Sequence, residues 1–185
     1  MNCERVHKRK RMETLETGFS LGSNLGDRLA NLRNARAALC NMPGLNMILQ
    51  ASVYETMPFD VPAEYECLFF LNTILIFEAE QPQMNAHSLL AAVKEIEKKM
   101  GRTKSKTRNS PRIIDIDILY MGSTSIASPV LSIPHREWSN RRFILEPLAE
   151  IRSWLLIPGA DKTVSEMLKT LDDPGKAVKV EAGNW

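Results

Sequence analysis

The chain has 185 residues, a net charge of +2 and 44% hydrophobic residues, a composition typical of one globular domain. A chain of this length buries roughly 70% of its surface on folding, so it needs no disulfide or metal to hold it together. The three cysteines (Cys3, Cys40 and Cys67) match no zinc-ligand spacing, which favours a reducing compartment. The longest apolar run, residues 68–77, is too short for a bilayer, and no signal peptide is recognised. We therefore expect a cytoplasmic protein without membrane contact.

The N-terminal end of the chain is strongly basic. Residues 1–12 carry five Lys/Arg and one acid, while the rest of the chain is slightly acidic. Because such a segment has little apolar surface to bury, residues 1–16 are predicted to be a disordered tail and residues 17–185 a single domain. Nucleic-acid binding or localisation by the tail is the less favoured alternative. We expect a monomer and leave a dimer open.

Four apolar stretches are predicted to be strands. The first contains Phe19 and Leu21, and the others are residues 46–56, 67–77 and 110–120. The third of these is expected to be buried on both faces. One helix follows the sequence GSNLGDR, with Asn24 as its cap, and a second runs from Asn85 to Gly101. Further helices are expected near 141–150 and 163–171.

The elements follow one another in the order β-α-β-β-α-β, which is the split βαβ arrangement. This order predicts an α+β, ferredoxin-like fold. Its sheet would have four mostly antiparallel strands, with the helices packed on one face. The other face would be left for the loops to build a site.

Residues 110–120, SPRIIDIDILY, contain two carboxylates within an apolar strand. Asp115 and Asp117 are two residues apart, so their side chains point the same way, with Cα atoms about 6.6–6.8 Å apart. Two such anions repel each other unless a cation lies between them, and Mg²⁺ prefers a few carboxylate oxygens together with substrate phosphates. The pair therefore suits a magnesium site. Taken alone, such a pair is more often the solvent face of an edge strand over an isoleucine core.

The surrounding sequence favours a phosphorylated ligand. Residues 102–112, RTKSKTRNSPR, contain five basic residues and no acid, and Lys and Arg bind phosphate oxygens. His135, Arg141 and Arg142 follow some twenty residues after the aspartates. Asn72 interrupts an apolar strand, and it must bond either the backbone or the edge of a ligand. GSNLGDR is not a dinucleotide-binding GxGxxG motif, and GRTKSKT is not a P-loop.

Five motifs in this order resemble the 6-hydroxymethyl-7,8-dihydropterin pyrophosphokinase (HPPK) family of folate biosynthesis. They are GSNLGDR, FLN, the GR after the second helix, PRxxDxDIL and PHxxxxxR-F, spread over roughly residues 18–160. The resemblance implies a ferredoxin-like fold and transfer of pyrophosphate from MgATP to the hydroxymethyl oxygen of the pterin, with release of AMP. The chain departs from the family at Asn109 and Ser110, and Lys94 stands where some relatives have glutamine.

The resemblance also implies roles for individual residues. Asp115 and Asp117 would be catalytic and would ligate two Mg²⁺ ions, with Arg102 and Arg112 as catalytic phosphate ligands. The remaining nucleotide-binding residues would be Glu97, Lys104, His135 and Arg141. The pterin would be bound by Thr56, Phe59, Phe70, Asn72 and Phe143, where Asn72 bonds its edge and Phe70 and Phe143 sandwich its ring. Asn24 would help to position the loops.

Three other interpretations are weighed against this one. A nucleotidyltransferase also combines a Gly-Ser turn with a DxD pair, but there the two lie close in sequence, whereas Ser23 and Asp115 are far apart here. An RNA-binding ferredoxin-like module would need aromatic residues on the sheet, where this chain has acids. No nucleic-acid partner is therefore expected. An inactive relative would not be expected to keep both aspartates together with Arg102, Arg112 and His135.

Overall fold

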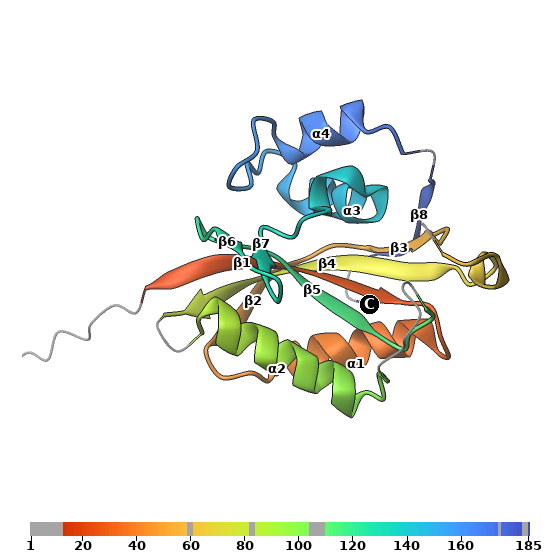
Figure 1. The fold of residues 1–185 in the computed structure, drawn as a ribbon, viewed down its shortest axis with the longest axis horizontal. Coiled ribbons are helices and arrows are strands. Elements are labelled where there is room, and N and C mark those ends of the chain that lie inside the picture. Colours follow the sequence, from red (N-terminus) through yellow and green to blue (C-terminus); the bar gives the residue numbers. More distant parts are fainter. Residues whose placement is uncertain (1–12, 59–60, 82–83, 104–109, 174, 183–184) are drawn as a thin grey trace, which may run out of the picture.

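The structure is a computed structural model that describes residues 13–58, 61–81, 84–103, 110–173, 175–182 and 185 (Figure 1). Its helices are α1 (Arg28–Cys40), α2 (Ala86–Lys99), α3 (Arg142–Arg152) and α4 (Val164–Thr170). The longer strands are β1 (Thr14–Ser23), β2 (Leu45–Gln50), β3 (Val53–Thr56), β4 (Phe70–Glu80), β5 (Asp115–Met121) and β8 (Ala177–Glu181). The two-residue strands β6 (Ile126–Ala127) and β7 (Ser132–Ile133) form a separate small sheet.

The main sheet has the order β5-β1-β4-β3-β8, and β2 also pairs with β4. All of these pairings are antiparallel. The α+β class and the split βαβ order are therefore confirmed, but the prediction of four strands was wrong, because the described sheet has six. One addition is β8, a five-residue strand that was not predicted and whose two valines, Val178 and Val180, are both exposed. The other arises because residues 46–56 form two strands and not one.

The break between β2 and β3 has a local cause in side-chain hydrogen bonds. The hydroxyl of Thr73 on β4 donates to the carbonyl oxygens of Ala51 and Ser52, each at 3.2 Å. The backbone N–H of Ser52 donates to Glu150 on α3 at 2.9 Å. These side chains replace part of the ladder bonding at residues 51–52, so the regular strand is interrupted there.

Helices cover both faces of the sheet, which corrects the prediction that they lie on one face. Figure 1 shows α1 and α2 on one side and α3 and α4 on the other. The reason is that β4 is buried on both faces, as the sequence predicted. Leu75 and Phe77 belong to the core under α1 and α2, whereas Ile74 and Ile76 belong to the core under α3 and α4. Each apolar face needs its own cover.

The helix ends follow ordinary capping rules, with one correction. Asp27, and not Asn24, caps α1, because its side chain accepts a hydrogen bond from the N–H of Ala30. Asn85 caps α2 as predicted and accepts from the N–H groups of His87 and Ser88. The helices expected near 141–150 and 163–171 are confirmed as α3 and α4.

The predicted N-terminal tail, residues 1–16, extends too far along the chain. Residues 1–12 lie outside the described residues, but β1 begins at Thr14, and residues 14–16 pair with residues 78–80 of β4. These residues belong to the sheet because β4 is long enough to pair with them. None of the helices in the described ranges has the length and apolar character that crossing a bilayer requires.

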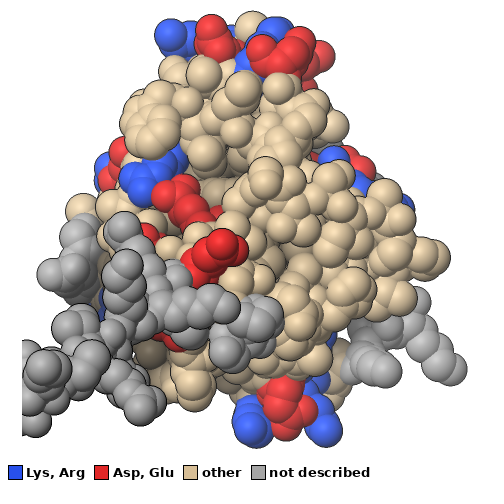
Figure 2. All heavy atoms as spheres, turned by 90° about the vertical axis from the view of Figure 1, so that its left-hand side faces the viewer, with Lys and Arg blue, Asp and Glu red and all other residues tan. Residues whose placement is uncertain are grey.

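Charged residues on the face shown in Figure 2 lie in small groups that mix acidic and basic side chains. Uncharged residues cover most of the described surface between these groups. This distribution is the usual one for charged side chains that stay in contact with solvent.

Candidate active site

A pocket lies where β1, β4 and β5 run side by side, and the register of the three strands brings its residues together. Gly22 on β1 is the Cα partner of Asn72 on β4 and also of Asp115 on β5. Ser20 pairs with Asp117 in the same way. The pocket is lined by Ser20, Gly22, Thr56, Met57, Val61, Phe70, Asn72, Arg112, Asp115, Asp117, Arg141 and Phe143.

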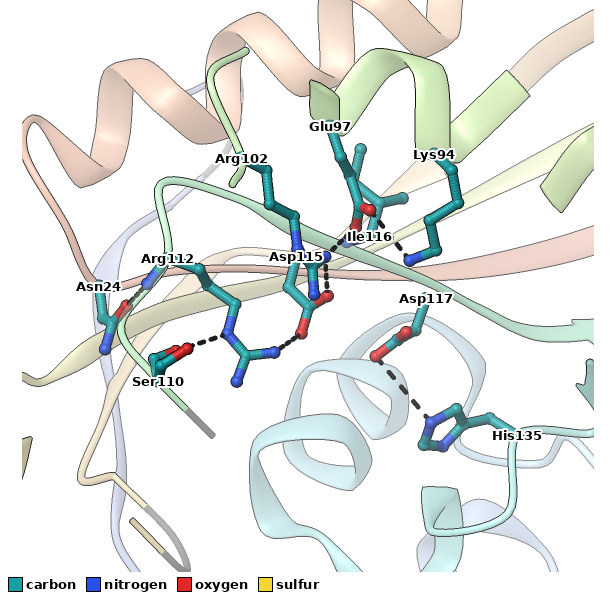
Figure 3. Close-up of polar contacts among 10 residues, drawn as sticks. All are labelled: Asn24, Lys94, Glu97, Arg102, Ser110, Arg112, Asp115, Ile116, Asp117 and His135. Carbon is teal, nitrogen blue, oxygen red and sulfur yellow. Dashed lines mark hydrogen bonds and ion pairs between the residues drawn. The ribbon is translucent and has the colours of Figure 1, made fainter. Parts of the chain in front are cut away.

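Asp115 is held by two arginines from the basic segment. Nη1 of Arg102 donates to its Oδ1, and Nη1 of Arg112 donates to its Oδ2 at 2.5 Å (Figure 3). Burial acts to raise the pKa of this carboxyl, but the charges of Arg112 and Arg102 outweigh it and hold the pKa below its usual value. Asp115 is therefore ionised at neutral pH.

Asp117 has a different environment, although it lies only two residues further along β5. Its side chain lines the pocket, and its ion-pair contact with Nε2 of His135 is long, at 4.0 Å. Burial and the neighbouring charge of Asp115 raise the pKa of Asp117 to about 7. Burial and Arg141 lower the pKa of His135, so the imidazole gives this carboxylate little positive charge. The pocket thus holds a carboxylate that lacks a close cationic partner among the described residues.

Glu97 lies behind the aspartates on α2, with its side chain 3% exposed. Its Oε1 accepts hydrogen bonds from Nη1 of Arg102 and from the backbone N–H of Ile116 at 2.8 Å. Its Oε2 accepts from Nζ of Lys94 at 2.9 Å. Figure 3 shows Arg102 between Glu97 and Asp115, in contact with both. Glu97 itself is not among the residues that line the pocket.

The start of the GSNLGDR motif holds the segment that carries Arg112. Oδ1 of Asn24 accepts from the N–H of Arg112 at 2.7 Å, and the N–H of Asn24 donates to the Arg112 carbonyl at 3.2 Å. The hydroxyl of Ser23 donates to the carbonyl of Ile113 at 2.6 Å. The carbonyl of Ser110 accepts from Nε of Arg112 at 3.2 Å. Since this last bond uses the backbone, it does not depend on which side chain stands at position 110.

The opposite wall of the pocket is aromatic and polar. Asn72 is buried, and its Nδ2 donates to Oγ1 of Thr56 at 2.7 Å. Phe70 on β4 and Phe143 on α3 both line the pocket. The guanidinium of Arg141 lies 5.5 Å from the centroid of the Phe143 ring. A flat ligand with a polar edge would find stacking surfaces and hydrogen-bonding groups here.

The structure brings most of the sequence-predicted residues to this one place. Eight of them line the pocket, and Arg102 and His135 contact residues that do, whereas Glu97 contacts Arg102. Phe59 and Lys104 lie outside the described residues. The sequence analysis missed Ser20, Gly22, Met57 and Val61. A signal for the first two was present, because GFSLG alternates small and large residues, which predicts one open strand face.

The donor set of the pocket suits a magnesium ion that is shared with a ligand. Asp115 and Asp117 present carboxylate oxygens on one strand face, and Asp117 lacks a close cation. Among the described residues, no three His, Cys, Asp or Glu side chains are grouped as metal ligands. Mg²⁺ is usually bound by one or two carboxylates plus substrate phosphates, so the residues present fit that kind of site.

Comparison with known proteins places the chain in context. The family model of 7,8-dihydro-6-hydroxymethylpterin-pyrophosphokinase (HPPK) matches residues 18–153. The 2-amino-4-hydroxy-6-hydroxymethyldihydropteridine pyrophosphokinase of Methylorubrum extorquens is 36% identical over 157 residues, which cover 85% of this chain and 94% of that enzyme. The mitochondrial folate synthesis bifunctional protein of Pisum sativum is 39% identical over 136 residues, which cover 74% of this chain. The chain spans only 25% of the pea protein's length.

The fold is also found among solved structures. A crystal structure of Plasmodium falciparum HPPK-DHPS with pterin and p-hydroxybenzoate matches with a TM-score of 0.66 at 17% identity. The match covers 88% of this chain and 44% of that chain. Because the family model extends over most of the sequence and a relative of similar length is more than a third identical, this chain belongs to the HPPK family.

Proposed function

We propose that this chain transfers pyrophosphate from MgATP to 6-hydroxymethyl-7,8-dihydropterin, a step of folate biosynthesis. The bond that forms joins the hydroxymethyl oxygen to the β-phosphorus of ATP. The bond that breaks joins that phosphorus to the oxygen of the α-phosphate, and the hydroxyl proton is lost. The products are the pterin diphosphate and AMP. The observation that carries the proposal is that a heterocycle-sized aromatic wall and an aspartate–arginine cluster share one pocket.

The aromatic side of the pocket would bind the pterin. Phe70 and Phe143 offer stacking surfaces, and such contacts with a flat ring are favourable when the faces are offset or tilted. Asn72 and Thr56 lie together beside them and would bond the polar edge of the ring. This binding would hold the hydroxymethyl group toward β5. Phe59, expected from the sequence to bind the pterin, is included in the proposal.

The charged side of the pocket would bind the triphosphate. Transfer of a phosphoryl-type group needs positioning and charge stabilisation more than covalent help from the protein. Arg102 and Arg112 now neutralise Asp115, and the same guanidiniums would contact phosphate oxygens, joined by Arg141 and His135. Lys104, expected to contact the nucleotide, belongs to the same proposal.

Magnesium would be held by Asp115 and Asp117, and two ions are proposed. Bound there, Mg²⁺ would neutralise negative charge on the phosphates and orient them. The protein's own contribution is to keep both carboxylates on one strand face and to surround them with cations. The proposal further includes a monomeric, cytoplasmic protein whose single catalytic domain includes β1 from Thr14 onward, and which has no nucleic-acid partner.

The test is an assay for AMP. Purified protein with MgATP and the hydroxymethyl pterin should release AMP and form the pterin diphosphate. The Asp117→Ala variant should lose this activity while keeping the circular dichroism spectrum of the fold. Asp161→Ala, which changes an exposed acid remote from the pocket, serves as the matched control and should remain active. Formation of ADP, release of inorganic pyrophosphate, or full activity of Asp117→Ala would overturn the proposal.

A further inference from the structure

The buried carboxylate of Glu97 has hydrogen-bond partners that link α2 to the strand carrying the two aspartates. Three donors from three segments converge on it: Lys94 from α2, Arg102 from the segment after α2, and the backbone of Ile116 from β5. A carboxylate that is only 3% exposed loses its hydration and must be compensated by such partners. With all three in place, little of Glu97 remains open to a ligand.

One of these bonds fixes the strand that carries the aspartates. β5 is an edge strand of the described sheet, so one side of it has no neighbouring strand. The N–H of Ile116 lies on that side, between Asp115 and Asp117, and it donates to Oε1 of Glu97 at 2.8 Å. The N–H groups on the open side of an edge strand find no partner in the sheet and need another acceptor. Glu97 therefore holds β5 at the residue between the two carboxylates.

A second bond orients the arginine. A single nitrogen, Nη1 of Arg102, donates both to Oε1 of Glu97 and to Oδ1 of Asp115 (Figure 3). The Arg102 side chain is thus held between a buried carboxylate and one at the pocket. The approach of this cation to the reacting phosphates depends on where Glu97 holds it.

We propose that Glu97 is a positioning residue, which aligns Arg102 and fixes the open edge of β5, and that it does not itself contact the nucleotide. This inference rests on the proposed pyrophosphate transfer and replaces the nucleotide-binding role expected for Glu97 from the sequence. Partners that orient metal-binding side chains typically contribute about 10–100-fold to activity, and we expect an effect of that order for the partner of a phosphate-binding arginine. Loss of Glu97 should therefore lower kcat more than it weakens binding of either substrate.

Two substitutions separate the two proposed roles of Glu97, which are to align Arg102 and to fix β5. Glu97→Gln keeps an oxygen acceptor for the N–H of Ile116 but removes the charge that holds Arg102. Glu97→Ala removes both. Glu95→Gln is the matched control, because Glu95 lies on the same helix, is half exposed, and pairs only loosely with Lys98 and Lys99. We expect kcat to fall roughly tenfold in Glu97→Gln, further in Glu97→Ala, and not at all in Glu95→Gln.

A double-mutant cycle decides whether Glu97 acts through Arg102. In an Arg102→Ala background, adding Glu97→Gln should change kcat by less than about twofold, because the group it orients is already gone. Calorimetric binding of Mg²⁺ with a non-hydrolysable ATP analogue should be nearly unchanged in Glu97→Gln. The proposal is wrong if the effects of the two substitutions on kcat multiply fully. It is also wrong if Glu97→Gln loses binding of the nucleotide analogue while kcat is kept, because Glu97 would then be a direct nucleotide ligand.

Hydrogen exchange tests whether Glu97 fixes β5, and it requires no enzymatic activity. The Ile116 amide should stay protected in wild type and Glu97→Gln and should exchange at least about tenfold faster in Glu97→Ala, with the melting temperature of each variant recorded alongside. Unchanged protection in Glu97→Ala would overturn this role of Glu97. Because the exchange measurement uses no substrate, it stands even if the chain releases no AMP, so failure of this inference and failure of the proposed function can be told apart.

Discussion

Asn24 and Arg112 lie 88 residues apart in the sequence, yet they exchange two hydrogen bonds beside the pocket. The side-chain oxygen of Asn24 accepts from the N–H of Arg112, and the N–H of Asn24 donates to the Arg112 carbonyl. Because Arg112 also donates to Asp115, this contact links the turn after β1 to the charge cluster on β5. The asparagine of GSNLGDR therefore serves the site and not the helix, whose cap is Asp27.

Replacing Asn24 should misplace Arg112. In Asn24→Ala the Arg112 N–H loses its side-chain acceptor, which costs about 1–2 kcal/mol of unfolding free energy because the site is buried. We expect AMP release to slow roughly tenfold, since a small misplacement of a catalytic group is expensive. Urea unfolding and the AMP assay measure the two effects. Asn41→Ala, at an exposed position, should change neither, and equal behaviour of the two variants would contradict the prediction.

A substitution at Gly22 tests whether Asn72, on the aromatic side of the pocket, binds the pterin. A Cβ atom at this position would lie 2.8 Å from Oδ1 of Asn72, closer than real contacts allow, and 3.7 Å from Cδ1 of Phe70. Gly22→Ala must therefore displace the Asn72 side chain. We expect affinity for the pterin to fall roughly tenfold while nucleotide affinity stays within about twofold, as titration calorimetry with each ligand would show. A pterin affinity equal to that of wild type would mean that Asn72 does not contact the ligand.

A second charge cluster, away from the pocket, should make stability depend on pH. Glu16 on β1 accepts from the hydroxyl of Tyr120 and from Arg152, each at 2.8 Å. Burial acts to raise the pKa of Glu16, but these hydrogen bonds outweigh it and lower the pKa below its ordinary value of 4.5. A carboxylate with a lowered pKa stabilises the fold above the unfolded-state value, and this contribution is lost as the pH falls through the folded-state value.

Glu16→Gln measures that contribution. The variant should be about 1–2 kcal/mol less stable than wild type at pH 7, where the carboxylate is ionised and partly screened by solvent. The difference between the two proteins should shrink as the pH falls below 4.5. Urea unfolding at pH 7, 5 and 3 would show this. A difference that stays constant across that range would rule out the charge of Glu16 as its source.

Trp185 should contribute strongly to stability, because its side chain is buried and bonded. Trp185 is 2% exposed, and its Nε1 donates to the carbonyl of Ala51 at 2.9 Å, while the guanidinium of Arg36 lies 4.9 Å from its ring. Trp185→Ala should cost about 3–5 kcal/mol, and Trp185→Phe should retain much of the packing. Trp154→Ala is the control, because Trp154 is 69% exposed, and its effect should be within about 0.5 kcal/mol. Equal effects of the two alanine variants would contradict the structure.

The parts of the fold that could be predicted from the sequence are those that depend on local periodicity. The alternation of Ile116 and Ile118 with Asp115 and Asp117 follows from the two-residue repeat of a strand, and the structure shows the isoleucines buried and the aspartates facing the pocket. The continuous apolar run of β4 predicted burial on both faces, and the structure confirms it. Burial on both faces also requires helices on both sides of the sheet. The prediction that the helices pack on one face did not take this into account.

The site was predictable as a set of residues but not as an arrangement. The family motifs assign Asp115, Asp117 and Asn72 to one site. That Gly22 lies between Asn72 and Asp115, however, depends on the register of three strands distant in sequence. Periodicity within one strand carries no information about register with another, because register is set by packing and by turns elsewhere. For this reason the sequence did not place Gly22 and Ser20 beside Asn72 and the aspartates, although the alternation in GFSLG indicated an open strand face.

What the sequence determined by itself was the order of the elements, the shared face of the two aspartates and the membership of one family. What only the tertiary structure decided was which cations meet which carboxylates. Arg102 and Arg112 hold Asp115, Glu97 binds Arg102 and the N–H of Ile116, and Asp117 remains without a close cation among the described residues. The physical reason is that ionic and hydrogen-bonding partners are chosen by distance in space, which a chain acquires only when its strands and helices have packed.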